Sequence, residues 1–281
     1  MRKYRRILYQ NCLLEVTYAV VSGISQTKVQ TFGTVSLFTA SGVPSATQSE
    51  ANILTALWIF SLYAVIFFVP VQIFYRYLII VRDVVITNKC YVIMLIPSFI
   101  TVLLISGGYY ATISLTPGCT SDIIEKLKLS NNGHDLACVP LVLTHPAMIV
   151  LLSVALTGMT LCFIFVPLVS YLVYKNLKRK ASMTSSEKSV QRQVSFTLIL
   201  QVCIIAITSL FPLGCILINM VLTSSVPWLS TIASATFSVL PVVNPILTMF
   251  TIRSYRRVLF VTARKVYGKK NFVSIMKLSI T

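Results

Sequence analysis

An apolar run of 30 residues, from Asn52 to Val81, constrains the fold of this chain more than any other feature. At 1.5 Å per residue a helix of this length exceeds the roughly 30 Å of a hydrocarbon core, so the run predicts a helix that crosses a membrane. The run carries Phe74-Tyr75-Arg76-Tyr77 near its end, shortly before Arg82. Arginine at the end of such a helix indicates which side of the membrane that end faces.

The composition also indicates a bilayer environment. Hydrophobic residues make up 56% of the 281 residues and charged residues 11%, and the mean hydropathy is +0.83. The apolar runs are continuous over about 20 residues rather than alternating over about ten, which argues against a β-barrel. The net charge of +17 does not indicate a nucleic-acid partner, because the basic residues lie between the apolar runs, where lipid head groups and cytosolic partners meet them. We therefore expect an all-α membrane protein.

Six apolar runs predict six transmembrane helices in a single domain covering residues 1–281. The expected spans are residues 7–24, 52–81, 91–113, 146–174, 194–222 and 228–252. The first run could instead be a signal peptide, but Glu15 interrupts it and no A-x-A cleavage site follows. We expect residues 28–41 to be the end of the first helix and a loop. Residues 253–281 are expected to form a cytosolic tail that begins as an amphipathic helix on the membrane surface.

The distribution of lysine and arginine predicts the orientation. With the N-terminus inside, the cytosolic side receives four basic residues before the first span, three around the end of the second, six in the loop 175–193 and eight in the tail. This side then holds 21 of the 24 basic residues, against three on the outer side. The positive-inside rule therefore puts both termini in the cytosol.

Motifs near the helix ends resemble those of a receptor family. They are Phe74-Tyr75-Arg76-Tyr77, then Gln191, Gln193, Leu198, Gln201 and Pro212, and finally Pro241-Val242-Val243-Asn244-Pro245-Ile246-Leu247-Thr248 with Ile252 and Tyr255-Arg256. In order, spacing and topology the chain from Tyr4 to Arg257 resembles the nematode chemosensory receptors of the Str superfamily. These are seven-helix G-protein-coupled receptors, and the last helix here is most similar to the Srd and Srh branches.

The resemblance implies an olfactory or other chemosensory receptor in the plasma membrane of a chemosensory neuron. Its partners would be a small-molecule odorant and a heterotrimeric G protein. Such receptors have seven spans, so this GPCR-like bundle of six is expected to lack the first helix. Gly42-Val43-Pro44-Ser45 stands where the family often has Gly-Pro-Cys, which leaves no cysteine there. Cys119 and Cys138 share the polar loop 114–145, and we expect either a disulfide between them or two unrelated thiols.

The resemblance also gives Arg76 the role of a switch. A permanently charged guanidinium can hold neighbouring helix ends together at rest and contact a partner when a ligand favours their separation. The residue pattern alone fits equally well with an anchor that extends to the lipid phosphates. The candidates for the switch and for G-protein coupling are Tyr75, Arg76, Tyr77, Lys178, Arg179, Gln193, Asn244, Pro245, Tyr255 and Arg256.

Glu15 is the only carboxylate inside a predicted span, and such a residue is by default a candidate for function. It lies eight residues after Ile7, and Asn244 lies eight residues before Ile252, so both are about 12 Å from the cytosolic end. Equal depth permits a shared polar pocket, hydrated or holding a cation. The pocket would consist of Asn11, Glu15, Ser238 and Asn244. The alternative is a protonated Glu15 with a local hydrogen bond.

Aromatic and polar residues of four predicted spans are candidates for ligand contact. They are Trp58, Tyr63, Tyr109, Tyr110, Asn219, Trp228, Thr231 and Ser234. A mostly apolar cavity with few hydrogen-bonding groups suits a small volatile or soluble organic molecule. The alternative is that these side chains only pack within the bundle or lie at the membrane interface.

Other classes of protein fit the sequence less well. With seven acidic residues, two histidines and no ligand-spaced Cys/His cluster, we expect no enzyme activity, no cofactor and no metal. A transporter is an alternative, although it would require an internal repeat or a charged site at mid-membrane. A channel would need polar or charged rings along a pore. A truncated receptor that no longer signals is a further alternative.

Overall fold

The computed structural model describes residues 5–32, 35–43, 46–116, 119, 121–130, 137–142, 145–179, 185–221, 227–251 and 256. The helices in this part of the chain are α1 (Arg5–Ser25), α2 (Gln48–Phe67), α3 (Val69–Ile80), α4 (Asn88–Leu115), α5 (Ser121–Ser130), α6 (Pro146–Arg179), α7 (Ser185–Val221) and α8 (Pro227–Thr251). The strands are β1 (Thr27–Phe32), β2 (Val35–Ala40) and β3 (Cys138–Val142).

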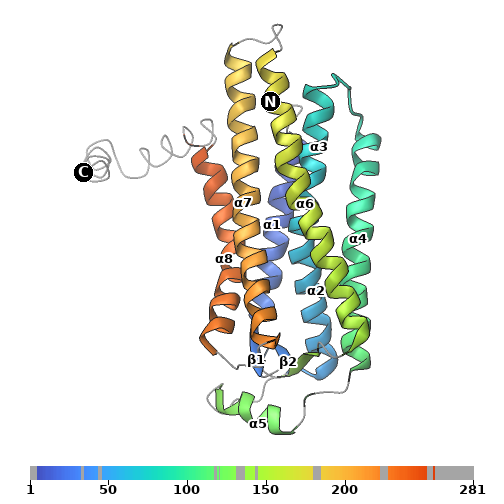
Figure 1. Cartoon of the computed structure of the whole chain (residues 1–281), viewed down its shortest axis with the longest axis vertical. Coiled ribbons are helices and arrows are strands. Elements are labelled where there is room, and N and C mark those ends of the chain that lie inside the picture. Colours follow the sequence, from blue (N-terminus) through green and yellow to red (C-terminus); the bar gives the residue numbers. More distant parts are fainter. Residues whose placement is uncertain are drawn as a thin grey trace, which may run out of the picture.

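The long helices run alternately in opposite directions and form one bundle (Figure 1). α1 begins at the end of the bundle where α3, α6 and α8 end. We call this the basic end, defined by residues 5–7, 76–90, 175–179 and 185–193. The strands and α5 lie at the opposite end, which we call the sheet end, defined by residues 25–32, 35–43, 46–48, 137–142 and 145–148.

In the part of the chain that the structure describes, five stretches are long and apolar enough to cross a membrane. They are Gln48–Ile80, Asn88–Leu115, Pro146–Leu177, Ser195–Asn219 and Trp228–Thr251. Large apolar side chains cover the outside of the bundle, and Leu104, Ile164 and Phe250 are each at least 60% exposed. A continuous apolar surface of this kind indicates contact with lipid. The prediction of an α-helical membrane protein is therefore confirmed.

α1 packs beside α2 and α8 and has two different faces. Leu13, Val16 and Val20 are more than half exposed on its outer side. Glu15 and Tyr18 are buried on its inner side. An apolar outer stripe with polar groups turned inward is the pattern of a helix between lipid and protein. Its polar residues lower the mean hydropathy of α1, which explains why α1 is not among the five stretches named above.

α2 and α3 form one central span. α2 begins with a capping box in which Glu50 Oε2 accepts from the Thr47 amide at 2.7 Å and Thr47 Oγ1 accepts from the Glu50 amide at 3.4 Å. Only Phe68 separates the two helices, next to Pro70, which has no N–H to donate to the helical ladder. Residues 61–69 are all buried, because this span packs against α1, α4 and α6. The span therefore connects the two ends of the bundle.

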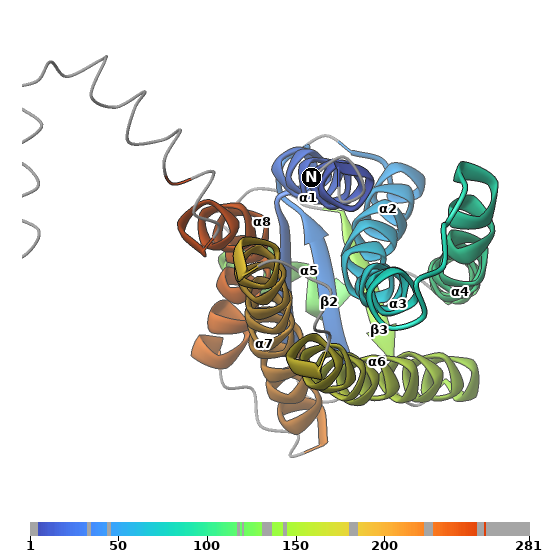
Figure 2. The same ribbon diagram turned by 90° about the horizontal axis from the view of Figure 1, so that it is seen from above.

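A small antiparallel sheet closes the sheet end, with strand order β1-β2-β3. Viewed along the bundle, β1 lies beside α8, whereas β2 and β3 lie beside α2 (Figure 2). The prediction of a helix end and a loop for residues 28–41 is therefore wrong. In β1 the buried Val29 and Thr31 alternate with the exposed Lys28, which is the two-residue period of a strand with one covered face.

The hairpin of β1 and β2 returns directly to the end of α1. Gln26 adopts a left-handed conformation (φ 41°) where the chain leaves α1. The Gly42 amide then donates to the Ser25 carbonyl at 3.2 Å. A Cβ atom at position 42 would lie 2.0 Å from the carbonyl oxygen of Ile24, so only glycine fits this close approach.

The basic segment 175–193 is mostly helical. α6 continues to Arg179 and α7 begins at Ser185, so both helices extend beyond the expected ends of their spans. The prediction of a loop is wrong for residues 175–179 and 185–193, and residues 180–184 lie outside the described part of the chain.

Candidate functional site

Arg76 is buried at the basic end, between α3, α6 and α7. Only 2% of its surface is exposed. It lines a cavity of about 10 Å³ together with Ser170 of α6 and Ser195 of α7, and Ile73 and Val173 complete the lining. The side chain therefore lies among three helices instead of extending outward from the end of α3.

The two tyrosines beside Arg76 attach α3 to different neighbours. Tyr75 is buried edge-on against Tyr91 of α4, with ring centroids 5.0 Å apart. The Tyr91 hydroxyl in turn donates to Gln10 Oε1 of α1. Tyr77 is half-buried, stacks on Phe74 and packs near the basic end of α6. These contacts fix the end of α3 relative to α1, α4 and α6.

The remaining switch candidates lie on α6, α7 and α8. Lys178 and Arg179 lie in the last turn of α6, and Gln193 is half-buried in the first part of α7. Arg256 is exposed, and Tyr255 lies outside the described residues.

Asn244 is buried in α8, and its Oδ1 has no hydrogen-bond partner among the described residues. Its backbone carbonyl accepts from Thr248 Oγ1 at 2.9 Å. Thr248 Oγ1 in turn accepts from Gln201 Nε2 of α7 at 2.8 Å. Pro245, the next residue, lies inside the same helix. Gln201 thus connects α7 to the segment of α8 that carries Asn244.

A chain of hydrogen-bonded side chains, with Asn11 half-buried and the other two buried, joins α1 to α3. Asn11 Nδ2 donates to Glu15 Oε1 at 2.8 Å, and Gln72 Nε2 donates to Asn11 Oδ1 at 3.2 Å. Glu15 is 7% exposed and Gln72 is 1% exposed. Gln72 was missed by sequence reasoning, although an amide within the apolar run 52–81 was a signal that could have identified it.

The structure does not bring the whole predicted pocket together. Ser238 is exposed, and its hydroxyl donates to the Ser234 carbonyl of its own helix at 3.0 Å. In the described part of the chain no hydrogen bond connects Asn244 with Glu15. Asn11 and Glu15 therefore interact with each other and with Gln72, whereas Ser238 lies on the outer face of α8.

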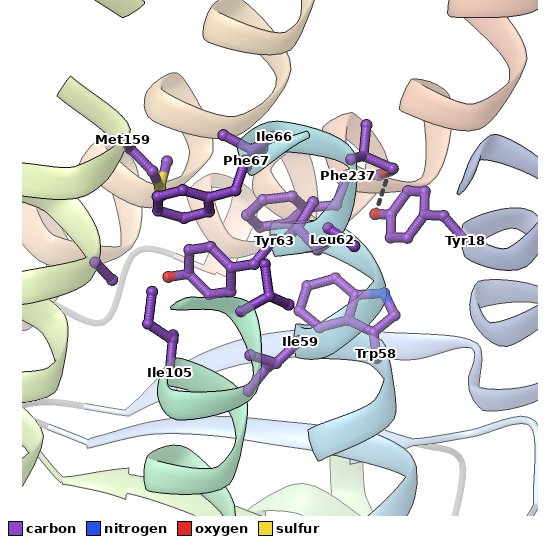
Figure 3. Close-up of a cluster of buried hydrophobic side chains, with 14 of the residues drawn as sticks. Tyr18, Trp58, Ile59, Leu62, Tyr63, Ile66, Phe67, Ile105, Met159 and Phe237 are labelled. Atoms are coloured by element: carbon purple, nitrogen blue, oxygen red, sulfur yellow. Dashed lines mark hydrogen bonds between the residues drawn. The ribbon is translucent and has the colours of Figure 1, made fainter. Parts of the chain in front are cut away.

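An aromatic cluster connects the sheet to the bundle (Figure 3). Trp58 of α2 is buried and meets the ring of Phe237 of α8 edge-on, with ring centroids 5.4 Å apart. It also meets the ring of Phe38 of β2 in a tilted arrangement, with ring centroids 6.0 Å apart. The Tyr18 hydroxyl of α1 donates to the Phe237 carbonyl at 3.0 Å. α1, α2, α8 and the sheet therefore share one core. Sequence reasoning missed Tyr18, Phe38 and Phe237, because no local pattern shows which helix faces meet.

Two further candidates for ligand contact are paired with each other. Tyr63 of α2 and Tyr109 of α4 are both buried, and their side chains are hydrogen bonded to each other. Tyr63 also lies close to Phe67, with ring centroids 6.0 Å apart (Figure 3). The pair links α2 to α4 at the level of the aromatic cluster.

Ser234 of α8 holds the edge of the sheet. Its hydroxyl accepts from the Val29 amide at 2.9 Å and lies 3.3 Å from the Val29 carbonyl oxygen, which it can donate to. β1 is an edge strand, so the amide and carbonyl of Val29 on that side have no partner strand. The Ser230 carbonyl of α8 lies nearer to this hydroxyl, at 3.0 Å, and competes for its single proton. Ser234 therefore satisfies the Val29 amide, which would otherwise be buried without a hydrogen bond.

The other candidates for ligand contact differ in exposure. Asn219 is buried in α7. Tyr110, Trp228 and Thr231 are exposed, with 62% of the Trp228 surface accessible. Exposed aromatic rings near the ends of spans are typical of membrane-interface residues.

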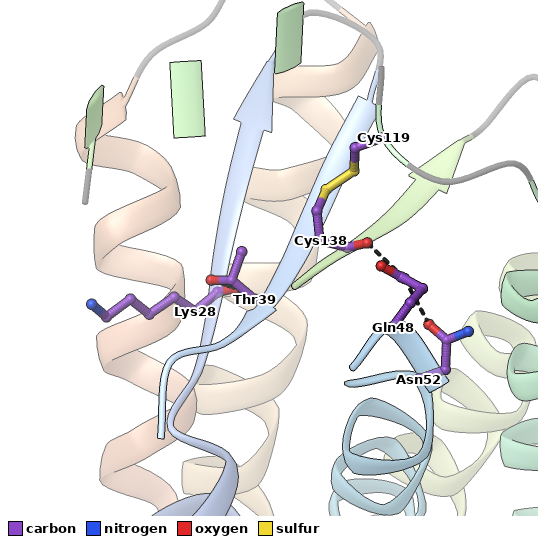
Figure 4. The surroundings of a disulfide bond; sticks show 6 residues. All are labelled: Lys28, Thr39, Gln48, Asn52, Cys119 and Cys138. Atoms are coloured by element: carbon purple, nitrogen blue, oxygen red, sulfur yellow. Dashed lines mark hydrogen bonds between the residues drawn. A yellow bond between two sulfur atoms is a disulfide. The ribbon is translucent and has the colours of Figure 1, made fainter. Parts of the chain in front are cut away.

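A disulfide connects the segment after α4 to the sheet (Figure 4). Cys119 and Cys138 are bonded, with their Cα atoms 6.2 Å apart. Gln48 in the first turn of α2 donates from Nε2 to the Cys138 carbonyl at 2.8 Å and to Asn52 Oδ1 at 3.1 Å. β3 is thereby fastened on one side to the chain that follows α4 and on the other side to α2.

Together these features define a multi-pass helical membrane protein with a buried arginine at its basic end and a sheet across the other end. The family model of the serpentine type 7TM GPCR chemoreceptors, Str, matches residues 1–260. The chain belongs to this chemoreceptor family, which confirms the resemblance found from the motifs. This is a family of receptors, not of enzymes. A search of curated proteins gave no significant match. The nematode origin and the absence of a first receptor helix stay predictions.

Proposed function

We propose that this protein binds a small organic ligand among the sheet-end halves of its helices and signals to a heterotrimeric G protein at its basic end. In this proposal it lies in the plasma membrane of a chemosensory cell, with the basic end and both termini in the cytosol. Membership of the chemoreceptor family supports the general activity. The concentration of lysine and arginine at one end of the bundle supports the orientation.

The burial of Arg76 is the observation that carries the proposal. A guanidinium cannot lose its charge, so its position between α3, α6 and α7 ties the arrangement of these helices to its contacts. If α6 or α7 moves outward, the same group becomes exposed at the cytosolic surface. Rigid-body movement of helix ends is a common form of switching, and here it would couple ligand binding to G-protein access.

The α2–α3 span provides the connection between the two sites. Trp58 and Arg76 are 18 residues apart on it, which is about 27 Å along a helix. Between them Pro70 has no N–H to donate to the helical ladder, whereas the Phe68 amide still donates to the Ala64 carbonyl at 3.1 Å. A ligand that displaces Trp58 or Tyr63 can therefore change the tilt of α3, and this tilt positions Arg76.

The test compares two arginines of the same helix end. Arg76→Ala and Arg82→Ala each remove one positive charge, but Arg82 is exposed in the turn after α3. The variants are expressed with a G-protein reporter, their amount at the cell surface is measured, and the cells are exposed to a panel of volatile organic compounds. We expect a response in the wild type and in Arg82→Ala, and a strong reduction in Arg76→Ala.

Two results would contradict the proposal. A response that is equal in Arg76→Ala and Arg82→Ala at equal surface expression would show that Arg76 is only an anchor. Ion current or substrate uptake in cells that lack G proteins would instead indicate a channel or a transporter. Arg76→Lys retains the charge without the planar fork of donors, and we expect it to signal less than wild type.

A further inference from the structure

Ser195 differs from two threonines of α7 in its hydrogen bonding. Thr197 and Thr208 both donate to the carbonyl four residues before them, at 2.9 and 2.8 Å. Ser195 is 6% exposed, and its Oγ has no hydrogen-bond partner among the described residues. A buried hydroxyl without a partner is costly and therefore rare, so this oxygen requires an explanation.

The cavity beside Ser195 has the size and the lining for one water molecule. Its volume of about 10 Å³ is close to the smallest that accommodates a single water. Three polar side chains, Arg76, Ser170 and Ser195, reach it from three different helices. A water needs two to four polar partners to be stable in a protein interior, and three side chains can supply them.

A second cavity of the same size provides a comparison. It lies between α2, α3, α6 and α7 and is lined by residues such as Ile66, Val166 and Ile205, with a single thiol, Cys162, among them. Such an apolar lining offers a water molecule almost no hydrogen bonds, so cavities of this kind stay dry. The polar lining at Arg76 therefore distinguishes its cavity from this apolar one.

We propose that an ordered water bridges the Arg76 guanidinium to the hydroxyls of Ser170 and Ser195 and holds α3, α6 and α7 together in the resting state. Arginine has only donors, whereas water and the serine hydroxyls both donate and accept. The water can thus accept from Arg76 and donate to Ser195. The water and the two serine hydroxyls add to the contacts that Arg76 makes in this cavity.

The bridge explains how a buried arginine can be released. Once the helix ends separate, bulk water can replace the bridging water, so the guanidinium and both hydroxyls keep hydrogen-bond partners and the separation requires little free energy. This part of the inference rests on the proposed signalling function. The bridge itself does not, because it concerns only the resting structure. Ser170 and Ser195 are then positioning residues that act through Arg76.

The first test is a change in thermal stability of the purified full-length receptor, and it requires no ligand. Ser195→Ala is compared with Ser209→Ala, because Ser209 is also buried on α7 with a hydroxyl that has no partner, but does not line the cavity. Removing a hydroxyl that has no partner is neutral or stabilising. Removing one that binds a bridging water is destabilising. We therefore expect a lower melting temperature for Ser195→Ala and an unchanged or higher one for Ser209→Ala.

The second test measures signalling without ligand. Loss of one bridging hydrogen bond should shift the resting equilibrium about fivefold towards the signalling state in Ser195→Ala and Ser170→Ala, but not in Ser209→Ala. In an Arg76→Met background the same serine substitutions should not lower the melting temperature further, because the shared partner is gone. Density for a water at Ser195 in a high-resolution structure would support the bridge directly.

The outcomes separate the two proposals. If Ser195→Ala melts no lower than Ser209→Ala, the bridge is refuted, whatever the signalling result. If Ser195→Ala melts lower but no variant activates a G protein, the bridge stands as a structural feature and the proposed function fails. If the effects of Ser195→Ala and Arg76→Met on melting are additive, Ser195 does not act through Arg76 and the bridge is also refuted.

Discussion

The contact between Ser234 and β1 leads to a prediction for the closure of the sheet end. Ser234→Ala removes the acceptor of the Val29 amide, which lies 2.9 Å away. Ser238→Ala is a matched control, since Ser238 lies one turn further on the same helix but is exposed and bonded only to its own helix. The first substitution should loosen the hairpin, and the second should not.

The expected magnitude follows from the burial of Val29. This residue is 2% exposed, so its amide cannot exchange the lost partner for bulk water. A buried amide without a partner costs about 1–3 kcal/mol, which corresponds to a factor of about 5–150 in a local opening equilibrium. The Ser238→Ala change should stay within about 0.5 kcal/mol, as is usual for surface positions.

Hydrogen–deuterium exchange of peptides from residues 27–40 in the purified receptor measures this opening. We expect faster exchange in Ser234→Ala and wild-type rates in Ser238→Ala. Equal rates in all three proteins would refute the assignment of Ser234 as a sheet anchor. If the exchange of β1 is unchanged but the response to ligands is lost, Ser234 is a ligand contact instead.

Two further comparisons test the core and the turn at the sheet end. Trp58→Ala should lower the free energy of unfolding by about 3–5 kcal/mol because the ring is buried. Trp228 is 62% exposed, so Trp228→Ala should change the melting temperature little. Equal losses in the two variants would refute the role of Trp58 in the core. Gly42→Ala should destabilise the folded protein, because the new Cβ would lie 2.0 Å from the Ile24 carbonyl oxygen. A Cβ at Gly23 would have no atom within 4 Å, so Gly23→Ala should stabilise α1 by up to about 1 kcal/mol in the same melting assay. A stable Gly42→Ala protein would contradict the close approach.

The helices were the part of the fold that the sequence predicted best. Continuous apolar runs such as 91–113 and 146–174 lie within the observed helices α4 and α6, because burial in lipid requires both the apolar surface and the internal hydrogen bonds of a helix. The hairpin was missed although Val29 and Thr31 alternate with polar residues. Six-residue strands give a short signal, and the partner of β2 is β3, about 100 residues further along the chain.

The candidate site shows a similar division. Asn11 and Glu15 are four residues apart, so their contact follows from helix geometry. The sequence also gives the depth of each residue along its helix. It does not show whether the side chain at that depth faces the bundle or the outside. Ser234 and Ser238 are one turn apart on α8, yet one binds the sheet and the other is exposed. The partner of Asn11, Gln72, depends on which faces of α1 and α3 meet, and this is a property of the packed bundle.

The order of strands in the sheet constrains when the sheet can form while the chain is being made. β1 and β2 are made early, but β2 pairs with β3 only after α2, α3 and α4 have followed. Until then, the backbone groups of one β2 edge have no partner and can pair with other chains. Each newly made receptor therefore passes through an interval in which one edge of its hairpin is open to pairing with other chains.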